Sequence, residues 1–190
     1  MAPRSKVAVI LHAEVVGSTA LVRQDEHLAH DRIQAAFQRF SEALQAYGGS
    51  VHEIRGDALV AEFSRASDAA LATVAAQKGN TDSNTQLTDE IVPQIRIGIA
   101  LGEVGIADNA LTGAGVILAQ RLEQLADPGG ICISAAVREA VPERLPLDYA
   151  DLGDHDAKGF DEAVVAYAVL LKPGATLPEP VSAAVEAEVE

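Results

Sequence analysis

Two acidic residues, Glu14 and Asp57, lie where apolar stretches of the sequence end. Glu14 closes a stretch that begins with the apolar run of residues 7–11, and Asp57 stands at a Gly-Asp turn within residues 52–63. An acid at the end of a buried strand is costly unless it has a partner. Paired carboxylates are ligands that hard divalent cations prefer. The two acids therefore predict a divalent-cation site, although Asp57 alone would also suit a plain turn.

The segment after Glu14 consists of Val16, Gly17, Ser18 and Thr19, and it leads into a long helical pattern. The first N–H groups of a helix have no partner within the helix, and the helix dipole is positive there, so such a segment favours a bound phosphate. A phosphate cradle beside two carboxylates suits a nucleoside triphosphate carried by divalent cations. We therefore expect these four residues to contact phosphate.

Hydrophobic periodicity and turn signals indicate the elements that must position these residues. The pattern predicts a strand that ends near Glu14, a helix over 18–47 with an irregularity near 27–31, a hairpin over 52–63, an Ala-rich helix over 64–78 capped by Ser64 or Ser67, a polar loop over 79–84, a strand over 95–104, a helix over 113–125, a strand over 131–133, a helix over 134–141 and two strands within 145–171. The order βαββαβ predicts an α+β, ferredoxin-like core, in which a mixed, mainly antiparallel sheet is covered by helices on one side.

The composition suits one domain. The chain has 190 residues, of which 48% are hydrophobic, and this is enough for one sizeable core. After residue 171 the sequence becomes rich in Pro and acidic residues, so we expect a domain over residues 1–171 and a tail or linker over 172–190. The domain is then either part of a longer protein with further domains, or it ends in a loose tail.

The net charge of −14 argues against partners that need a basic surface, such as nucleic acid or an anionic membrane. An anionic nucleotide can still bind through local donors and bridging cations. No stretch is apolar over the roughly 18 residues that a membrane span needs, and the N-terminus lacks a signal-peptide pattern. We therefore expect a cytoplasmic protein without membrane insertion.

Three other residues that suggest chemistry have simpler interpretations. Cys132 lies in an apolar run and has no second cysteine to pair with, so we expect a small buried side chain. His27 and His30 stand three residues apart in a charged helical stretch. Their setting fits a solvated helix face better than a metal site.

Three stretches resemble class III nucleotide cyclases. Residues 13–22 (AEVVGSTALV) resemble the family's first metal-binding motif, residues 53–63 (EIRGDALVAEF) resemble its hairpin with the second metal-binding acid, and residues 113–134 (GAGVILAQRLEQLADPGGICIS) resemble the helix and strand that supply its transition-state arginine. The similarity runs in order from about residue 7 to residue 170. Diguanylate cyclases share this kind of core, but their Gly-Gly-acid-Glu-Phe hairpin signature is absent here.

The resemblance implies a cyclase homology domain with the family's ferredoxin-like fold. In that family a homodimer converts a nucleoside triphosphate, ATP or GTP, to a 3′,5′-cyclic nucleotide and pyrophosphate with two Mg²⁺ or Mn²⁺ ions. The metal ligands carried over are Glu14, Asp57 and the carbonyl of Val15. Each site lies across a two-fold interface, with the metals on one chain and Arg121 and Glu53 supplied by the other.

The resemblance also assigns roles around the triphosphate and marks two departures from the family. Lys158 matches the phosphate-binding lysine and Arg121 the transition-state arginine, although both would also suit ordinary surface positions. Glu14 stands where the family has Asp, and its extra methylene is expected to shift the ions or to favour Mn²⁺. Ile117 stands where the family has an asparagine, and it cannot donate a hydrogen bond.

Glu53 and Ala110 fall on the family's base-selecting positions. A carboxylate accepts both the N1–H and the 2-amino group of guanine, and it repels the N1 lone pair of adenine. Strand alternation puts Glu53 on the same face as Asp57, so Glu53 predicts a preference for GTP. Ala110 offers no second group to read the guanine O6. Alternatively, Glu53 is a surface residue paired with Arg55 or Arg96.

Three functions are open from the sequence. The first is an active class III homodimer. The second is a degenerate cyclase domain that binds nucleotide, or only dimerises, and regulates a segment attached after residue 171. The third is an unrelated ferredoxin-like binding module. The first requires a dimer, whereas the second only tolerates one.

Overall fold

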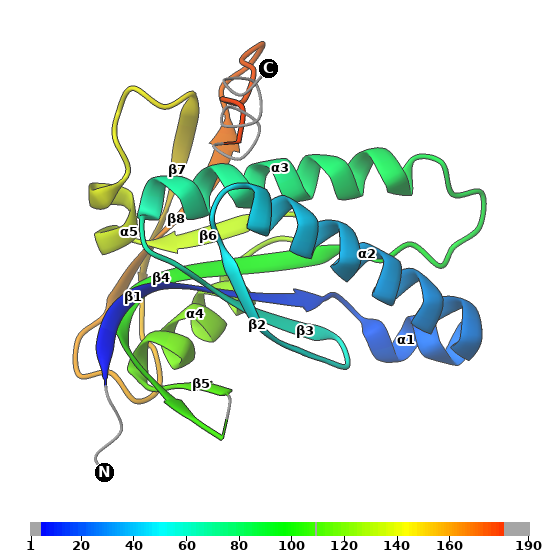
Figure 1. Cartoon of the computed structure of the whole chain (residues 1–190), viewed down its shortest axis with the longest axis horizontal. Helices are drawn as coiled ribbons and strands as arrows, with labels where there is room; N and C mark the ends of the chain where they lie inside the picture. The colour runs from blue at the N-terminus through cyan, green and yellow to red at the C-terminus, as the bar shows by residue number, and fades with distance from the viewer. Residues whose placement is uncertain (1–4, 109, 181–190) are drawn as a thin grey trace, which may run out of the picture.

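The computed structural model describes residues 5–108 and 110–180, which form one sheet with helices packed against it (Figure 1). The elements follow one another as β1 (Lys6–Val15), α1 (Ser18–Gln24), α2 (Glu26–Ala46), β2 (Ser50–Arg55), β3 (Ala58–Phe63), α3 (Ala66–Asn84), β4 (Ile95–Ala107), β5 (Ala110–Thr112), α4 (Ala114–Leu125), β6 (Ile131–Ser134), α5 (Ala135–Ala140), β7 (Leu147–His155) and β8 (Val164–Leu171). The strands and helices predicted from the sequence are all present, with shifted boundaries.

The sheet is mixed and mainly antiparallel. Its hydrogen-bonded neighbours follow the order β2-β3-β1-β4-β6-β8-β7, and β5 pairs with β4 outside this path. β1 is antiparallel to both β3 and β4, and β2 is antiparallel to β3, whereas β4 and β6 are parallel. This confirms the predicted ferredoxin-like βαββαβ core. The central position of β1 brings its end close to the turn of the β2–β3 hairpin.

Helices cover both faces of the sheet, so the prediction that they cover one face only is wrong. Val9 and Leu11 of β1 belong to the larger core, which also contains residues of α2 and α3. Ala8 and Ile10 point to the opposite face and belong to a second core with residues of α4. Both faces of β1 are apolar over residues 8–11, and a strand of this kind needs a cover on each side. Figure 1 shows α2 and α3 on one side and α4 on the other.

The helix starts differ from those predicted. The long helix expected over 18–47 is divided at Asp25, slightly before the predicted irregularity. Asp25 has an extended backbone, and its carboxylate accepts a hydrogen bond of 3.0 Å from the Leu28 N–H, which caps α2. α3 is preceded by Arg65 and has no side-chain cap, so neither Ser64 nor Ser67 is its N-cap.

α3 also continues beyond its predicted end at Lys78, through the segment expected to be a polar loop. Asn80 is buried, and Asn80 and Asn84 each donate a hydrogen bond of 3.0 Å to the carbonyl of Pro93. These tertiary hydrogen bonds favour the helical conformation of a segment whose local composition favours turns. α3 therefore extends beyond its predicted end because it is hydrogen-bonded to the segment that precedes β4.

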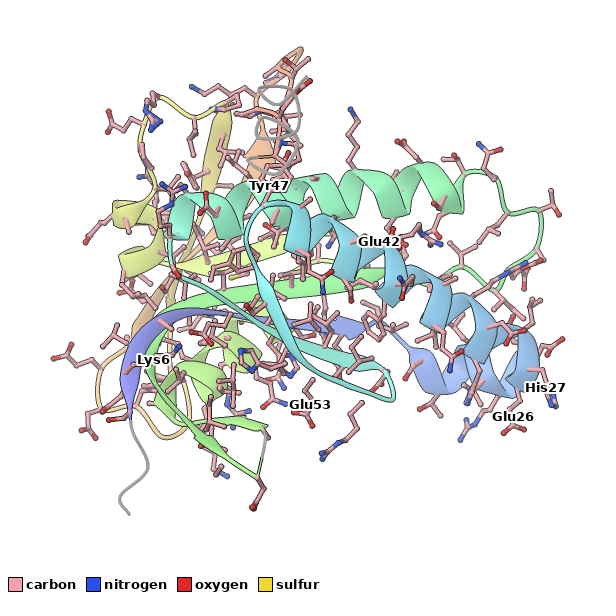
Figure 2. The ribbon with its side chains drawn as sticks, in the orientation of Figure 1. Lys6, Glu26, His27, Glu42, Tyr47 and Glu53 are labelled. Atoms are coloured by element: carbon pink, nitrogen blue, oxygen red, sulfur yellow. The ribbon has the colours of Figure 1, made fainter. Side chains whose placement is uncertain are left out.

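The described residues after β8 lie against the domain. Leu177 packs against the larger core, and the Tyr47 hydroxyl donates a hydrogen bond of 2.8 Å to the Pro178 carbonyl. Figure 2 shows Tyr47 at the end of α2, close to the C-terminal segment. Residues 172–180 of the predicted tail are therefore attached in this structure, and its residues 181–190 lie outside the described part.

Two further sequence expectations concern buried and membrane-spanning segments. Cys132 is buried in β6, as predicted, and burial raises the pKa of its thiol to about 12. Among the described residues, no helix combines the length and the apolar character that crossing a bilayer requires.

Candidate active site

The β2–β3 turn places Asp57 against the start of α1. The Ser18 hydroxyl donates a hydrogen bond of 2.6 Å to Asp57 Oδ2, and the Val15 N–H donates one of 2.8 Å to the Asp57 carbonyl. Gly56 makes this tight turn possible, because its φ of 60° lies in the left-handed region. The structure therefore brings together three of the predicted site residues, Val15, Ser18 and Asp57.

Strand pairing arranges side chains of the α4 face in rows across the sheet. In the first, the Glu14 row, Arg55 of β2, Ala58 of β3, Glu14 of β1 and Arg96 of β4 are paired neighbours. Paired residues project from the same face of a sheet. Alternation along β1 puts Glu14 on the side of Ile10, which packs with α4 residues. Glu14 thus lies beside a guanidinium on that face.

The second row lies next to the first and is called the His12 row. It consists of Glu53 of β2, Val60 of β3, His12 of β1 and Gly98 of β4. The Glu53 side chain is 26% exposed, whereas His12 is only 7% exposed. In Figure 2, Glu53 lies below the β2–β3 hairpin, on the side of the sheet where α4 and β5 are found.

His12 is a site residue that the sequence analysis missed. Burial lowers the pKa of its imidazole, and the charges of Glu14, Glu53 and Asp57 oppose this shift. These three carboxylates therefore lie close enough for their charges to act on the ring. The signal in the sequence was a polar residue inside an apolar strand, two positions before Glu14 and hence on the same face.

Arg96 and Glu123 were also missed as site residues. Arg96 Nη2 donates a hydrogen bond of 2.9 Å to Glu14 Oε2, and Arg96 Nε forms an ion pair with Glu123 Oε1. Glu123 is 1% exposed, and its burial, together with the nearby charge of Glu14, raises its pKa to about 8. The Arg96 guanidinium therefore contacts both Glu14 and Glu123. No sequence spacing signals this contact, because β1, β4 and α4 supply one residue each.

The pairing of Glu53 is partly as expected from the sequence. Its carboxylate forms an ion pair with Arg55, with 2.8 Å between Arg55 Nη2 and Glu53 Oε1, and Arg55 is 84% exposed. The other proposed partner, Arg96, belongs to the Glu14 row and pairs with Glu14, so the Glu53–Arg96 alternative is wrong. An ion pair this exposed contributes little stability, about 0–1 kcal/mol. Glu53 is therefore free to exchange Arg55 for a ligand at low cost.

Fewer of the predicted phosphate-binding residues are available to a phosphate in the structure. Gly17 adopts a left-handed conformation at the start of α1. The Val16 N–H donates a hydrogen bond of 2.8 Å to the Gln94 carbonyl, so it is not available to a phosphate in this conformation. The amide groups of Gly17, Ser18 and Thr19 are the remaining candidates. α1 has only seven residues, and its dipole is correspondingly small.

A groove of about 790 Å³ opens beside the Asp57 turn. Its polar end includes Ser18, Thr19 and Asp57, and its apolar wall includes Phe37 of α2 and Ile54 of β2. Neither Arg121 nor Lys158 is among its lining residues. Asp57 therefore faces this groove in the single chain, whereas Glu14 is not among its lining residues.

Arg121 lies on the far side of α4 from Glu123. Two positions along a helix rotate the side-chain direction by about 200°, so Glu123 faces the sheet and Arg121 faces away. Arg121 instead lines a cavity of about 160 Å³ with His155 and Asp156, and its Nη1 donates to Gln124 Oε1 at 3.4 Å. The structure does not bring Arg121 to the Glu14 and Asp57 carboxylates of its own chain.

Lys158 and Ile117 lie near this second cavity. Lys158 is exposed in the β7–β8 connection, just after the residues that line the cavity with Arg121. Ile117, one turn before Arg121 on α4, is 47% exposed. The phosphate-binding and transition-state candidates therefore share one side of the molecule, away from the Asp57 turn.

Ala110 begins β5, which pairs with β4 and lies against β2. Its pairing partner is Ala107 of β4, and its side chain is half-buried. The structure therefore places both predicted base-selecting residues, Glu53 and Ala110, on strands that contact each other without pairing. Ala110 still contributes no polar side chain there.

The donors at the Asp57 turn suit a hard divalent cation. Glu14 and Asp57 supply carboxylate oxygens and Val15 a carbonyl, and the Val15–Asp57 hydrogen bond holds the two segments together. The described residues contain no cluster of three or more His, Cys, Asp or Glu side chains arranged for a metal, and His27 and His30 are exposed. Mg²⁺ needs no such cluster, because it commonly binds through one or two carboxylates, substrate phosphates and water.

Comparison with known proteins identifies relatives of this chain. No model of a known protein family matches the chain. The chain is 34% identical over 162 residues to a Rhizobium meliloti (strain 1021) protein named "Putative adenylate cyclase 3", covering 85% of this chain and 28% of that protein. It is 33% identical over 162 residues to an uncharacterised protein of Mycobacterium tuberculosis, covering 83% of this chain and 54% of that protein. The chain thus spans about a quarter to a half of the length of these relatives.

Solved structures with the same fold are nucleotide cyclases. The structure matches the adenylyl cyclase CyaB from P. aeruginosa with a TM-score of 0.77 and 25% identity, over 92% of this chain and 98% of that one. The chain belongs to the class III nucleotide cyclase family. The guanylyl cyclase Cya2 shares the fold, with a TM-score of 0.79 and 23% identity over 94% of this chain and 100% of that one.

Membership of the class III family decides between some of the alternatives. The unrelated ferredoxin-like binding module is wrong, and the resemblance noted in the sequence is confirmed. Within this cyclase domain, the structure brings together Glu14, Val15, Ser18 and Asp57 on one side and leaves Arg121 with the β7–β8 connection on the other.

Proposed function

We propose that this cyclase domain converts a nucleoside triphosphate to a 3′,5′-cyclic nucleotide and pyrophosphate at a site shared by two copies of the chain. The observation that supports this most directly is the contact of the Asp57 turn with Ser18 and Val15, beside Glu14. It brings the Asp57 carboxylate and the Ser18 hydroxyl, two hard oxygen donors from different segments, to an open groove. This is the donor set that a metal-bound triphosphate requires.

The reaction breaks one bond and forms another at phosphorus. The ribose 3′ oxygen bonds to the α-phosphorus, its proton passes to solvent or a nearby base, and the bond to the leaving pyrophosphate oxygen breaks. Glu14, Asp57 and the Val15 carbonyl would hold Mg²⁺ or Mn²⁺ ions, which would supply charge stabilisation and a lower pKa for the attacking hydroxyl. The protein's own contribution is mainly positioning and electrostatics.

The roles of the chain's residues follow from their contacts. Ser18 fixes one oxygen of the Asp57 carboxylate and so orients the other. The amide groups of Gly17 and Thr19, with that of Ser18, are donors for phosphate oxygens. Arg121 and Lys158 carry the positive charge that the departing pyrophosphate and the α-phosphate need. Because these two cations lie away from Asp57 in one chain, a second copy supplies them.

The test is incubation with ATP or with GTP in the presence of Mn²⁺, with detection of the cyclic product by mass spectrometry. Asp57→Ala should remove product formation and weaken binding of the Mn²⁺–nucleotide complex at least tenfold, a typical loss when a metal-site group is removed. The matched control is Asp68→Ala, an acid on α3 that pairs only with Arg65. Equal nucleotide binding in Asp57→Ala and wild type would remove Asp57 from the site.

A catalytically degenerate, regulatory cyclase domain is the second candidate. It is favoured by the exposed Ile117 in place of a hydrogen-bond donor and by the Arg96 guanidinium paired with Glu14. The chain also spans only part of its longer relatives, which fits a module that acts on attached segments. Nucleotide binding with full dependence on Asp57 but without product would support this candidate over the first.

A further inference from the structure

His12 has a ring nitrogen without a partner. Its Nδ1 is fully buried, and no hydrogen bond to it is found within the described residues. A buried polar atom without a partner is rare and needs an explanation. Since an N–H at Nδ1 would find no acceptor, the ring proton belongs on Nε2. His12 therefore carries an N–H donor at Nε2 whether the ring is neutral or charged.

This donor stands opposite Glu53 in the His12 row. The two residues flank Val60 of β3, so their backbones are roughly 10 Å apart, two strand spacings. Both side chains rise from the same face, and Glu53 lies close enough for its charge to act on the His12 ring. Between them lies the apolar side chain of Val60, which is 7% exposed and belongs to the second core. The row thus has an acceptor at one side, a donor at the other and an apolar side chain between.

We propose that His12 and Glu53 together read the base of a guanine nucleotide, with His12 donating to O6 and Glu53 accepting from N1–H and the 2-amino group. This inference rests on the proposed nucleotide-binding function. Guanine presents one acceptor and two donors side by side, and the row offers the complementary donor and acceptors in the same order. His12 supplies the O6 contact that the apolar Ala110 cannot.

The same pair disfavours adenine. The adenine 6-amino group is a donor and would meet the His12 N–H, and the adenine N1 lone pair would meet the Glu53 carboxylate. Each mismatch leaves a polar group unpaired on binding, which is more costly than the loss of a neutral contact. His12 is thus a specificity-determining residue, and its contribution is separable from that of Glu53 because the two read different atoms.

Base analogues test the two contacts separately by competition against N-methylanthraniloyl-GTP with Mn²⁺. Relative to GTP, 6-thio-GTP chiefly weakens the O6 acceptor, and ITP lacks only the 2-amino group. Wild type should bind each analogue about 2- to 12-fold more weakly than GTP, the range for one hydrogen bond. His12→Phe should lose the 6-thio-GTP difference and keep the ITP difference. Glu53→Ala should do the reverse.

Controls separate a contact from a structural role. His12→Gln keeps a donor of similar reach and should retain part of the 6-thio-GTP difference, and thermal unfolding checks that each variant folds. If His12→Phe does not fold, wild type and His12→Gln still decide, since equal binding of GTP and 6-thio-GTP by wild type overturns the inference. A 6-thio-GTP difference that persists in His12→Phe also overturns it. Failure to bind any nucleotide contradicts the proposed function as well. Equal binding of GTP and 6-thio-GTP by wild type, or a difference that persists in His12→Phe, contradicts only the role of His12 and leaves the proposed function unaffected.

Discussion

The guanidinium of Arg96 lies between two carboxylates in different surroundings. Glu14 is about one-third exposed and Glu123 is almost fully buried, and burial raises the pKa of Glu123 despite its ion pair with Arg96. Glu14 has one methylene more than Asp, and its longer side chain carries the hydrogen bond to Arg96. This arrangement connects a proposed metal ligand to α4, the helix that bears Arg121. Residues of three elements thus hold one another in place.

Replacing Arg96 should therefore cost more than replacing the arginine at the other end of the Glu14 row. Arg96→Met keeps an apolar stem but removes the charge-assisted hydrogen bond to Glu14 and the ion pair with Glu123, so we expect a loss of about 2 kcal/mol in the free energy of unfolding. Arg55→Met removes only an exposed ion pair and should cost at most about 0.5 kcal/mol. Urea denaturation of both variants measures this. Equal losses would mean that Arg96 has no special structural role.

At the scale of elements, the sequence predicted most strands and helices, but it did not predict which helices cover each face of the sheet or where α3 ends. The β2–β3 hairpin and its Gly56-Asp57 turn were predictable because the turn chemistry is local. The second helical layer and the end of α3 were not, because they depend on partners distant in sequence. The same division holds in the site. Glu14 and Asp57 were predictable as strand-end acids, whereas Arg96 and Glu123 meet them only through the tertiary fold.

Two glycines test these helix assignments. Gly79 lies inside α3, and a Cβ there would meet no atom within 4 Å. Gly79→Ala should therefore stabilise the protein by about 0.5–1 kcal/mol, the usual gain for Ala over Gly in a helix. A Cβ at Gly98 would lie 2.1 Å from the Ala119 carbonyl oxygen, so Gly98→Ala should destabilise by about 1–3 kcal/mol or more and displace α4. Chemical denaturation of each variant checks both signs, and no gain in Gly79→Ala would place the end of α3 earlier.

The connection between α3 and β4 is fastened to α2 by an ion pair with a defined pH response. Arg32 Nη2 donates 2.6 Å to Asp89 Oδ2, and the Ile91 N–H donates 2.9 Å to Asp89 Oδ1. The hydrogen bonds from Arg32 lower the pKa of Asp89 from 3.8 to about 2. The stability that Asp89 contributes is therefore present above pH 3.8 and is lost as the pH falls from there through about 2.

Asp89→Asn should be less stable than wild type at pH 7, and the difference should shrink towards zero as the pH falls to about 2. Denaturant unfolding of both proteins at several pH values measures this difference. The neighbouring acid Glu90 is exposed, and Glu90→Gln is a control that should change stability by less than about 0.5 kcal/mol. A difference between wild type and Asp89→Asn that does not change with pH would show that the ionised carboxylate contributes nothing.

At the scale of the whole molecule, the candidate site is divided. The carboxylates and the amides proposed to bind phosphate lie at the Asp57 turn, and the cations Arg121 and Lys158 lie near the β7–β8 connection. The two sets are separated by α4, since Glu123 occupies the face of that helix towards Glu14 while Arg121 points away. A single chain of this shape has two half-sites. We propose that a two-fold pair of chains joins each half-site to its complement and creates two equivalent sites.

Subunit mixing tests this arrangement. Asp57→Ala and Arg121→Ala should each be inactive alone, since each homodimer lacks one half of both sites. In a mixed dimer one site carries both substitutions and the other carries neither, so an equal mixture should recover about one quarter of the wild-type activity per chain. Mass spectrometry of the intact dimers verifies that subunits exchange, and mixing Asp57→Ala with Asp57→Asn is the control that should stay inactive. Full exchange without recovery would place both halves of the site in one chain, and the separation of Arg121 from Glu14 by α4 would then have to close through a movement of that helix.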